Sequence, residues 1–424
     1  MSRMVSRLLP LALGVALMAG GAARAADEPA PAEGPAMVAP PPSGTQSLMQ
    51  QLRDIGLEPE QEGMDPQGLS SGGDDQPGLL DLLRRQREAR EAAREATEDP
   101  GEPILSLPPW LVPDVRAELR AIVQELSRYA RARQPGFAVL ARGGAPLAFR
   151  SRRAAVLEAA RIARAGQGNL DPDSPAAGVG EPASGFLAAI DGFVIDGQFC
   201  GEPPVSDEDL VRLADLNMVL ASIDHCASPD IADEARRRAR TAGLLIHVDT
   251  DPQGRLDDIP TERPWGENAD NITDPQQARS ILVLEDASGF GDVSLLIGAL
   301  RETNHDILVL DPFVLGEKAL AAQHVRELRY KKLGARRLVM AAFDVGYANA
   351  DEYYWEPSWD LGTPRWLSAT ALGRPGAHFT EFWDPAWKNQ LGEYFVAVMD
   401  LGFDGVMIDG LDAFKRWEAI MAVE

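Results

Sequence analysis

Cysteine and histidine are scarce in this chain of 424 residues, which contains two cysteines and five histidines. Two cysteines cannot define a disulfide scaffold, although Cys200 and Cys226 could pair in an oxidising compartment. The histidines are scattered and form no H-E-x-x-H motif, which argues against a catalytic zinc. The chain also lacks the elbow G-x-S-x-G and a G-x-G-x-x-G segment that opens a helix after a strand. The sequence therefore indicates neither a serine hydrolase nor a dinucleotide enzyme, and no metal or cofactor is expected.

Basic residues are outnumbered, because 41 Lys and Arg stand against 65 Asp and Glu and give a formal net charge of −24. Nucleic-acid binding needs clustered Lys and Arg, so this charge argues against it. An acidic surface would tolerate neutral or cationic polymers. After the N-terminal segment, no stretch approaches the roughly 20 apolar residues that cross a bilayer. No stable membrane span is therefore expected once that segment is removed.

The N-terminus has the three parts of an export signal. Met1 to Arg7 carries two arginines and no acid, Leu8 to Gly21 is apolar, and Ala23-Arg24-Ala25 is an A-x-A site. This order is typical of a signal peptide over residues 1–25. It predicts a periplasmic or secreted protein, and the alternative is a retained N-terminal anchor.

Residues 26–103 lack the composition of a folded core. Residues 27–43 are rich in Pro, Ala and Glu, and residues 56–77 are acidic and glycine-rich, so this segment is predicted to be a disordered linker. Residues 79–97 alternate Arg and Glu at spacings that support a solvated helix. We interpret that helix as a spacer or docking element. Residues 104–424 then form the folded domain.

Apolar runs and amphipathic stretches alternate from Pro113 onward. Strands that are apolar on both faces and alternate with helices predict a parallel sheet. Eight such units favour a closed α/β fold, a (β/α)8 TIM-type barrel, over the alternative of an open doubly wound sheet. The predicted strands are Phe137–Ala141, Gly192–Asp196, Met218–Asp224, Leu244–Asp249, Ile281–Glu285, Ile307–Asp311, Leu338–Asp344 and Gly405–Asp409. The predicted helices are Asp114–Arg133, Arg153–Ala165, Asp207–Leu216, Pro229–Ala242, Asp292–Thr303, Leu315–Leu333 and Pro385–Leu401.

Acidic residues end seven of the eight predicted strands. In a (β/α) barrel these strand ends converge on one mouth, where such enzymes place their sites. Crowded carboxylates push one another's pKa values apart, and glycoside hydrolysis needs such a pair of proton donor and base. Two alternatives stay open: single Asp residues often cap helices or turns, and clustered acids can bind Ca²⁺ or Mg²⁺. The seven are Asp196, Asp224, Asp249, Glu285, Asp311, Asp344 and Asp409.

Four segments of the C-terminal half carry family-like motifs. They are Asp306–Asp311, Asp344–Asn349 with Tyr353-Tyr-Trp355, Phe382-Trp-Asp-Pro-Ala-Trp387, and Gly402-Phe-Asp-Gly-Val-Met-Ile-Asp-Gly-Leu-Asp-Ala-Phe414. Together they resemble the endo-α-1,4-polygalactosaminidase-like proteins, glycoside hydrolase family 114 and its relatives. That superfamily includes extracellular proteins once misnamed as related to cysteinyl-tRNA synthetase.

The order of the motifs differs from that of the family. Val115–Leu147, Ile190–Asp196, Met218–Asp224 and Leu256–Pro260 resemble later family strands, yet they come first in this chain. The resemblance therefore implies a circular permutation, with family strands five to eight preceding strands one to four. Phe137–Ala141 is then expected to pair in parallel with Gly405–Asp409 and to close the barrel.

The resemblance implies a hydrolase that acts on an extracellular polysaccharide, such as an amino-sugar polymer. Asp311 and Asp409 match the family best and are expected to face one another across the mouth. Asp344 or Asp196 would replace the glutamate that relatives have where this chain has Tyr347. The candidate substrate-binding residues are Tyr347, Asn349, Tyr353, Trp355, Trp383, Asp224, Asp412 and Glu285. Cys200 and Cys226 follow strands expected to be adjacent, so they could form a disulfide near the mouth.

The replaced glutamates leave a second class of function open. Where relatives have two glutamates in G-E-A-E, this chain has Tyr347 and Asn349. A catalytically degenerate barrel could serve as a carbohydrate-binding or polysaccharide-assembly protein instead, and the fold alone does not decide between the two.

Overall fold

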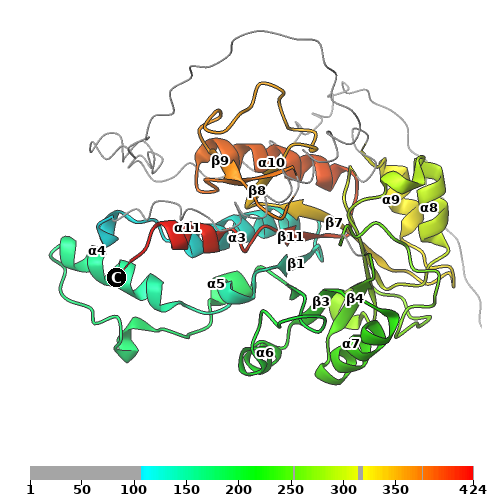
Figure 1. Ribbon diagram of the computed structural model, residues 1–424, viewed down its shortest axis with the longest axis horizontal. Coiled ribbons are helices and arrows are strands. Elements are labelled where there is room, and N and C mark those ends of the chain that lie inside the picture. The colour runs from blue at the N-terminus through cyan, green and yellow to red at the C-terminus, as the bar shows by residue number, and fades with distance from the viewer. Residues whose placement is uncertain (1–106, 252–253, 314–318, 375, 424) are drawn as a thin grey trace, which may run out of the picture. The chain divides into compact units, whose positions relative to one another are not determined.

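The computed structural model describes residues 107–251, 254–313, 319–374 and 376–423 (Figure 1). The predicted signal peptide at 1–25 and the predicted linker at 26–103, with its helix at 79–97, lie outside the described residues. Among the residues that are described, no helix is long and apolar enough to cross a membrane.

Eight parallel strands form the central sheet, in the hydrogen-bonded order β4-β3-β2-β1-β11-β7-β6-β5. The end strands β4 and β5 approach within 8 Å between Cα atoms, without a hydrogen-bonded ladder between their described residues. The sheet is therefore a nearly closed barrel, consistent with the TIM type. The strands are β1 (Ala138–Arg142), β2 (Gly192–Asp196), β3 (Val219–His225), β4 (Leu245–Asp249), β5 (Ile281–Leu284), β6 (Ile307–Leu310), β7 (Leu338–Asp344) and β11 (Gly405–Asp409).

The first and last strands of the barrel pair as expected. β1 lies parallel to β11, with Val139 opposite Val406 and Leu140 opposite Met407. The first residue of β11 is Gly405, and a larger residue would not fit because a Cβ there would lie 2.4 Å from the carbonyl oxygen of Ala138. This confirms the predicted pairing of the two strands, although the barrel is only nearly closed because β4 and β5 share no ladder among the described residues. The permuted strand order relative to the family stays a prediction.

Helices cover the outside of the barrel, and most begin at the predicted positions. They are α3 (Val115–Arg133), α4 (Arg152–Arg164), α5 (Ser184–Leu187), α6 (Asp207–Ala214), α7 (Pro229–Ala242), α8 (Val293–Arg301), α9 (Ala322–Leu328), α10 (Pro385–Asp400) and α11 (Phe414–Ile420). Side chains of Asp114, Ser151, Ser206 and Ser228 cap the first turns of α3, α4, α6 and α7. Such caps satisfy backbone amides that have no partner within the helix.

One predicted helix is too long, and two short helices were not predicted. The stretch Leu315–Leu333 contains only α9 among its described residues, because the chain turns after Arg329 and Tyr330 bridges to Arg336. The helices α5 and α11 span four and seven residues, too few for a clear amphipathic period.

The strands are buried on both faces, as parallel strands in a barrel must be. In β6, Ile307 and Val309 belong to the apolar cluster that fills the barrel, while Leu308 and Leu310 belong to the cluster beneath the helices. This alternation explains why the strand sequences read as continuous apolar runs.

A small antiparallel sheet between β7 and α10 was not predicted. Its strands β8 (Tyr347–Asn349), β10 (Ala377–Thr380) and β9 (Leu367–Thr370) follow the order β8-β10-β9. The strands have three or four residues each, too few for a period-2 pattern to stand out. The turn between β9 and β10 carries Arg374, whose role is described below.

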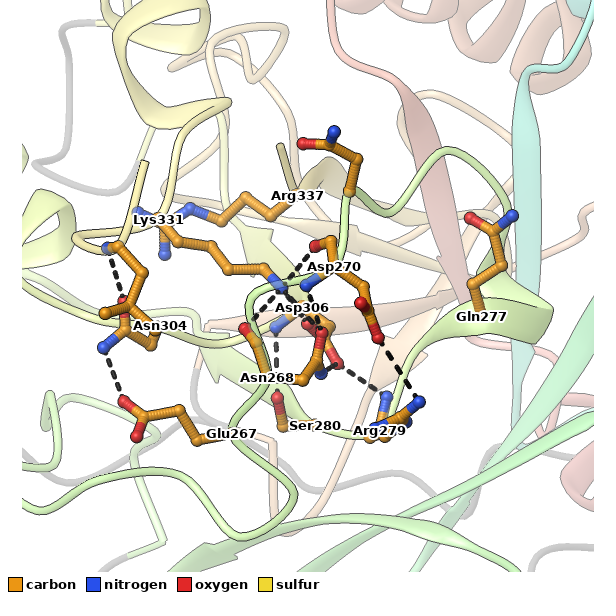
Figure 2. Close-up of polar contacts among 12 residues, drawn as sticks. Glu267, Asn268, Asp270, Gln277, Arg279, Ser280, Asn304, Asp306, Lys331 and Arg337 are labelled. Atoms are coloured by element: carbon orange, nitrogen blue, oxygen red, sulfur yellow. Dashed lines mark hydrogen bonds and ion pairs between the residues drawn. The ribbon is translucent and has the colours of Figure 1, made fainter. Parts of the chain in front are cut away.

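A buried ion pair lies at the amino end of β6, where Lys331 meets Asp306 (Figure 2). Both side chains are 0% exposed, and their nitrogen and oxygen atoms are 2.5 Å apart. The Lys331 ammonium also donates to the carbonyl oxygens of Asn268 and Asp270, while Asp306 accepts from the Arg279 amide. The network ties the loop before β5 to the end of α9.

Removing the cation of this network should be costly. We expect Lys331→Met to lower the free energy of unfolding by about 3–5 kcal/mol, because it leaves Asp306 buried without its partner charge. Urea denaturation followed by circular dichroism measures this loss. Lys332→Met is the matched control, since Lys332 is 57% exposed and pairs with Glu302 at the surface. Equal stability of the two variants would contradict a stabilising role for Lys331.

Candidate active site

A cavity of about 620 Å³ opens at the carboxyl ends of the barrel strands. It is lined by five of the seven strand-end acids, namely Asp196, Glu285, Asp311, Asp344 and Asp409, and also by Asp412, Tyr347 and Asn349. The strand-end pattern therefore located the mouth of the barrel, as expected for this architecture.

Arg142 at the end of β1 joins three of these acids. Its guanidinium lies 2.9 Å from Asp196, 2.6 Å from Glu285 and 3.2 Å from Asp409, and its side chain is 10% exposed. Arg142 was not among the predicted site residues. A basic residue at the end of the one strand without a terminal acid was the available signal.

A second arginine approaches from the small sheet. Arg374 Nη1 lies 3.5 Å from both Asp344 Oδ2 and Asp409 Oδ2, and Nη2 lies 3.6 Å from Asp412. Its guanidinium also covers the Tyr347 ring at 4.4 Å from the centroid. Asp344 and Asp409 occupy paired positions on β7 and β11, so the two carboxylates share this cation. Nothing local in the sequence marks Arg374.

The buried carboxyls divide into two protonation states. Burial alone would raise the pKa of Asp409, but the guanidinium groups of Arg142 and Arg374 hold it below its usual range. Burial, reinforced by the Asp409 charge, raises the pKa of Asp344 to about 7. Burial, with a contribution from Glu285, likewise raises the pKa of Asp311 to about 7. A proton acceptor and proton donors therefore share one cavity near neutral pH.

Glu352 is a further carboxyl that sequence analysis missed. Burial, together with the neighbouring charge of Asp311, raises the pKa of Glu352 to about 8. It lines the cavity beside Tyr354 and Tyr394. The nearby Tyr394 hydroxyl partly opposes this rise in the pKa of Glu352. Glu352 directly precedes the aromatic motif Tyr353-Tyr-Trp355, which was the only signal for it.

Asp311 and Asp409 do not lie on opposite sides of the mouth as expected. Only β7 separates β6 from β11 in the sheet, so Asp344 lies on the strand between them. Both acids nevertheless line the same cavity. Asp344, one of the two acids predicted to replace the family glutamate, is paired with Asp409 and lies on the strand between β6 and β11.

Asp224 does not belong to the cavity, contrary to the prediction. Its side chain is fully buried and accepts hydrogen bonds from the backbone amides of Phe199 and Cys200, at 2.6 and 2.7 Å. It therefore holds the loop after β2. Cys200 and Cys226, which the sequence left as a possible pair, form a disulfide that joins this loop to the residue after β3.

Three of the four predicted aromatic residues also lie outside the cavity lining. Trp383 is buried and packs against Phe382 and Trp417. Trp355 stacks on His378, and the half-exposed Tyr353 stacks on Phe313. These three rings pack against aromatic neighbours, and of the four predicted aromatic residues only Tyr347 lines the cavity.

The described residues contain no group of three or more His, Cys, Asp or Glu side chains placed to hold a metal ion. The alternative of a calcium or magnesium site has no support from this arrangement. The guanidinium groups of Arg142 and Arg374 already neutralise part of the acidic charge.

Comparisons with known proteins match only parts of the chain. A family model described as the Herpesvirus US12 family matches residues 79–141, which is too little of the chain to show membership. An uncharacterized protein of Thermotoga maritima is 35% identical over 18% of this chain and 24% of its own length. An uncharacterized protein of Deinococcus radiodurans is 30% identical over 30% of this chain and 40% of its own. An uncharacterized protein of Methanocaldococcus jannaschii is 26% identical over 28% of this chain and 34% of its own length. The chain thus spans well under half the length of these relatives.

Proposed function

We propose that this protein is a glycoside hydrolase that uses the carboxylates at the barrel mouth. The observation that carries the proposal is the pairing of Asp409, which contacts two guanidinium groups, with Asp344 on the neighbouring strand, whose pKa burial raises to about 7. Glycosidases need one carboxylate as nucleophile or base and one carboxylic acid as proton donor. Environments that push the pKa values of neighbouring acids apart assign these roles.

Asp409 takes the role of the carboxylate, because two guanidinium groups stabilise its charge. Asp311, Asp344 and Glu352 are the candidate proton donors, and Glu352 retains its proton to the highest pH. Tyr347, which replaces the family glutamate, cannot substitute for a carboxyl, since burial raises the pKa of its phenol further above neutrality.

The proposed substrate is an extracellular polysaccharide that contains amino sugars. Arg374 places a cation among Asp344, Asp409 and Asp412, so these carboxylates already accept positive charge. The lining holds eight carboxyl residues against three arginines, so acidic groups remain that would attract an ammonium group on a sugar. The disulfide suits an oxidising compartment, which supports the proposed export to the periplasm or beyond.

The permutation belongs to the same proposal. It is supported by the family-like segments Val115–Leu147 and Ile190–Asp196, which come first in this chain.

The test is incubation of the exported protein with galactosaminan and glucosaminan, each in acetylated and deacetylated form, followed by product analysis. Cleavage into oligosaccharides supports the proposal. The alternative, a carbohydrate-binding or assembly protein, is favoured by the replacement of the family glutamate by Tyr347. Binding of these polymers without any cleavage would establish that alternative.

The raised pKa values predict how activity depends on pH. The proton donor is active while protonated, so kcat should stay high below pH 7 and fall as pH rises through about 7 to 8. Asp409 is ionised throughout this range because its pKa is lowered. Initial rates between pH 5 and 9 measure the profile, with stability at each pH as the control. A rate that increases from pH 7 to 9 would contradict the assignment of a carboxyl donor.

A further inference from the structure

The cavity extends past the carboxylates to the ends of β3 and β4, where His225 lines it together with Gly254, Arg255 and Asp286. His225 is the last residue of β3 and Asp249 is the last residue of β4, and the two occupy paired positions in the sheet. β3 is separated from β11 by β2 and β1. This end of the cavity is therefore separated by two strands from the end of β11, which carries Asp409.

The imidazole of His225 is held by a buried carboxylate. His225 Nδ1 lies 3.0 Å from Asp249 Oδ2, and the Asp249 side chain is only 4% exposed. The other oxygen of Asp249 accepts from the Asp251 amide at 2.8 Å. Because a carboxylate only accepts hydrogen bonds, the neutral ring carries its proton on Nδ1 and leaves the Nε2 lone pair available. Among the described residues, Nε2 has no hydrogen-bond partner.

The surroundings limit the movement of the ring, although the His225 side chain is 39% exposed. Gly254 lies against it, and a Cβ at Gly254 would approach Nδ1 and Cε1 to 3.2 Å. Cys226, the next residue after His225, is joined to Cys200 and donates its amide to the Asp249 carbonyl at 2.9 Å. A polar group held in this way is preorganised for a ligand, since little side-chain freedom is left to lose.

The charged side chains at this end of the cavity indicate which chemical groups can bind there. Arg255 is paired with Asp251 and Asp257 at 3.1 and 3.0 Å. Asp286 and Glu285 add further acidic groups to the lining. An anion is disfavoured here, whereas a hydroxyl or ammonium group can donate to Nε2.

We propose that His225 forms a second sugar subsite, in which Nε2 accepts a hydrogen bond from a hydroxyl of a unit remote from the cleaved bond. This inference rests on the proposed hydrolase or carbohydrate-binding function. His225 is a substrate-binding residue in this scheme, and Asp249 is a positioning residue that selects the tautomer.

Oligosaccharides of increasing length test the subsite. Galactosamine oligomers of one to six units serve as probes, and the readouts are Kd by calorimetry and KM and kcat by product analysis. We expect His225→Phe to raise Kd and KM about tenfold for the longer oligomers and to leave those of the shortest unchanged. We expect kcat to be unaffected, because the reacting carboxylates are untouched. Asp249→Asn should act similarly, since its amide can donate to Nδ1 and move the ring proton to Nε2.

The controls separate the possible outcomes. His324→Phe lies on α9, outside the cavity lining, and should behave as wild type. Thermal unfolding of each variant identifies a folding defect, and His225→Gln then provides a milder change at the same position. Equal affinity of wild type and His225→Phe for every oligomer would overturn the subsite alone. A wild-type protein that neither binds nor cleaves any glycan would overturn both the subsite and the proposed function.

Discussion

Asp409→Asn should lower kcat on the cleaved glycan by at least about 10³-fold and leave folding and export intact. Asp409 is the carboxylate whose charge Arg142 and Arg374 stabilise, and an amide can act neither as nucleophile nor as base. Asp311→Asn should also abolish turnover if its protonated carboxyl serves the reaction. Product formation from the cleaved polymer measures both losses, and calorimetric binding shows that the variants still take up the substrate.

An aspartate at the surface provides the matched control for Asp409→Asn. Asp173 is 62% exposed and pairs with Arg152 outside the cavity, so Asp173→Asn should keep full activity. Retention of more than about a tenth of wild-type kcat in Asp409→Asn would remove Asp409 from the reaction, because general-base or nucleophile loss costs more than this.

Arg142→Gln should destabilise the fold by about 3 kcal/mol at pH 8, because the largely buried Asp409 and the half-buried Asp196 and Glu285 would lose their shared cation. Solvent screening of Asp196 and Glu285 keeps the loss at the lower end for a broken buried pair. The loss should shrink toward pH 5. Burial already holds the pKa values of Asp196 and Glu285 above their usual range, and Arg142 opposes that rise, whereas the pKa of Asp409 is held low. Without Arg142 all three pKa values rise, so the added cost to stability is greatest at high pH and fades as the acids take up protons. Urea denaturation at the two pH values measures the difference.

Arg152→Gln is the control for this variant, since the Arg152–Asp173 pair is exposed and should contribute nothing measurable. A loss for Arg142→Gln that is equal at pH 5 and pH 8 would point to lost packing rather than to unpaired charge. A loss no larger than that of Arg152→Gln would mean that the three acids are neutral even with Arg142 present.

The barrel could be predicted because its signals are local. β2, β7 and β11 match the predicted ranges, since each apolar run is bounded by polar residues, as in Gly192–Asp196. The caps Asp114 and Ser228 mark helix starts for the same reason. The small sheet escaped prediction because its strands are short and pair only with one another. The order of these strands depends on how the segment between β7 and α10 packs, and the spacing of apolar residues along the chain does not indicate that packing.

The candidate site could be predicted only in part. Parallel strands bring their carboxyl ends together, so an acid at each end was enough to predict a shared mouth, and five of the seven acids line one cavity. The same rule misplaced Asp224, because a strand-end side chain can turn toward a neighbouring loop instead of the mouth. The rule also did not predict which cation would balance these carboxylates. That cation is Arg142, at the end of β1.

The amino-acid sequence by itself determined the parallel strands, the helices that cover them and the acidic mouth, because these follow from the period and burial of neighbouring residues. Only the tertiary structure decided which carboxyls are charged. Arg374 comes from a turn 30 residues after Asp344, and Glu352 comes from the loop after β8. The pKa of a buried acid depends on desolvation and on charges that the fold brings within a few ångströms, and neither can be read from residues adjacent in the chain.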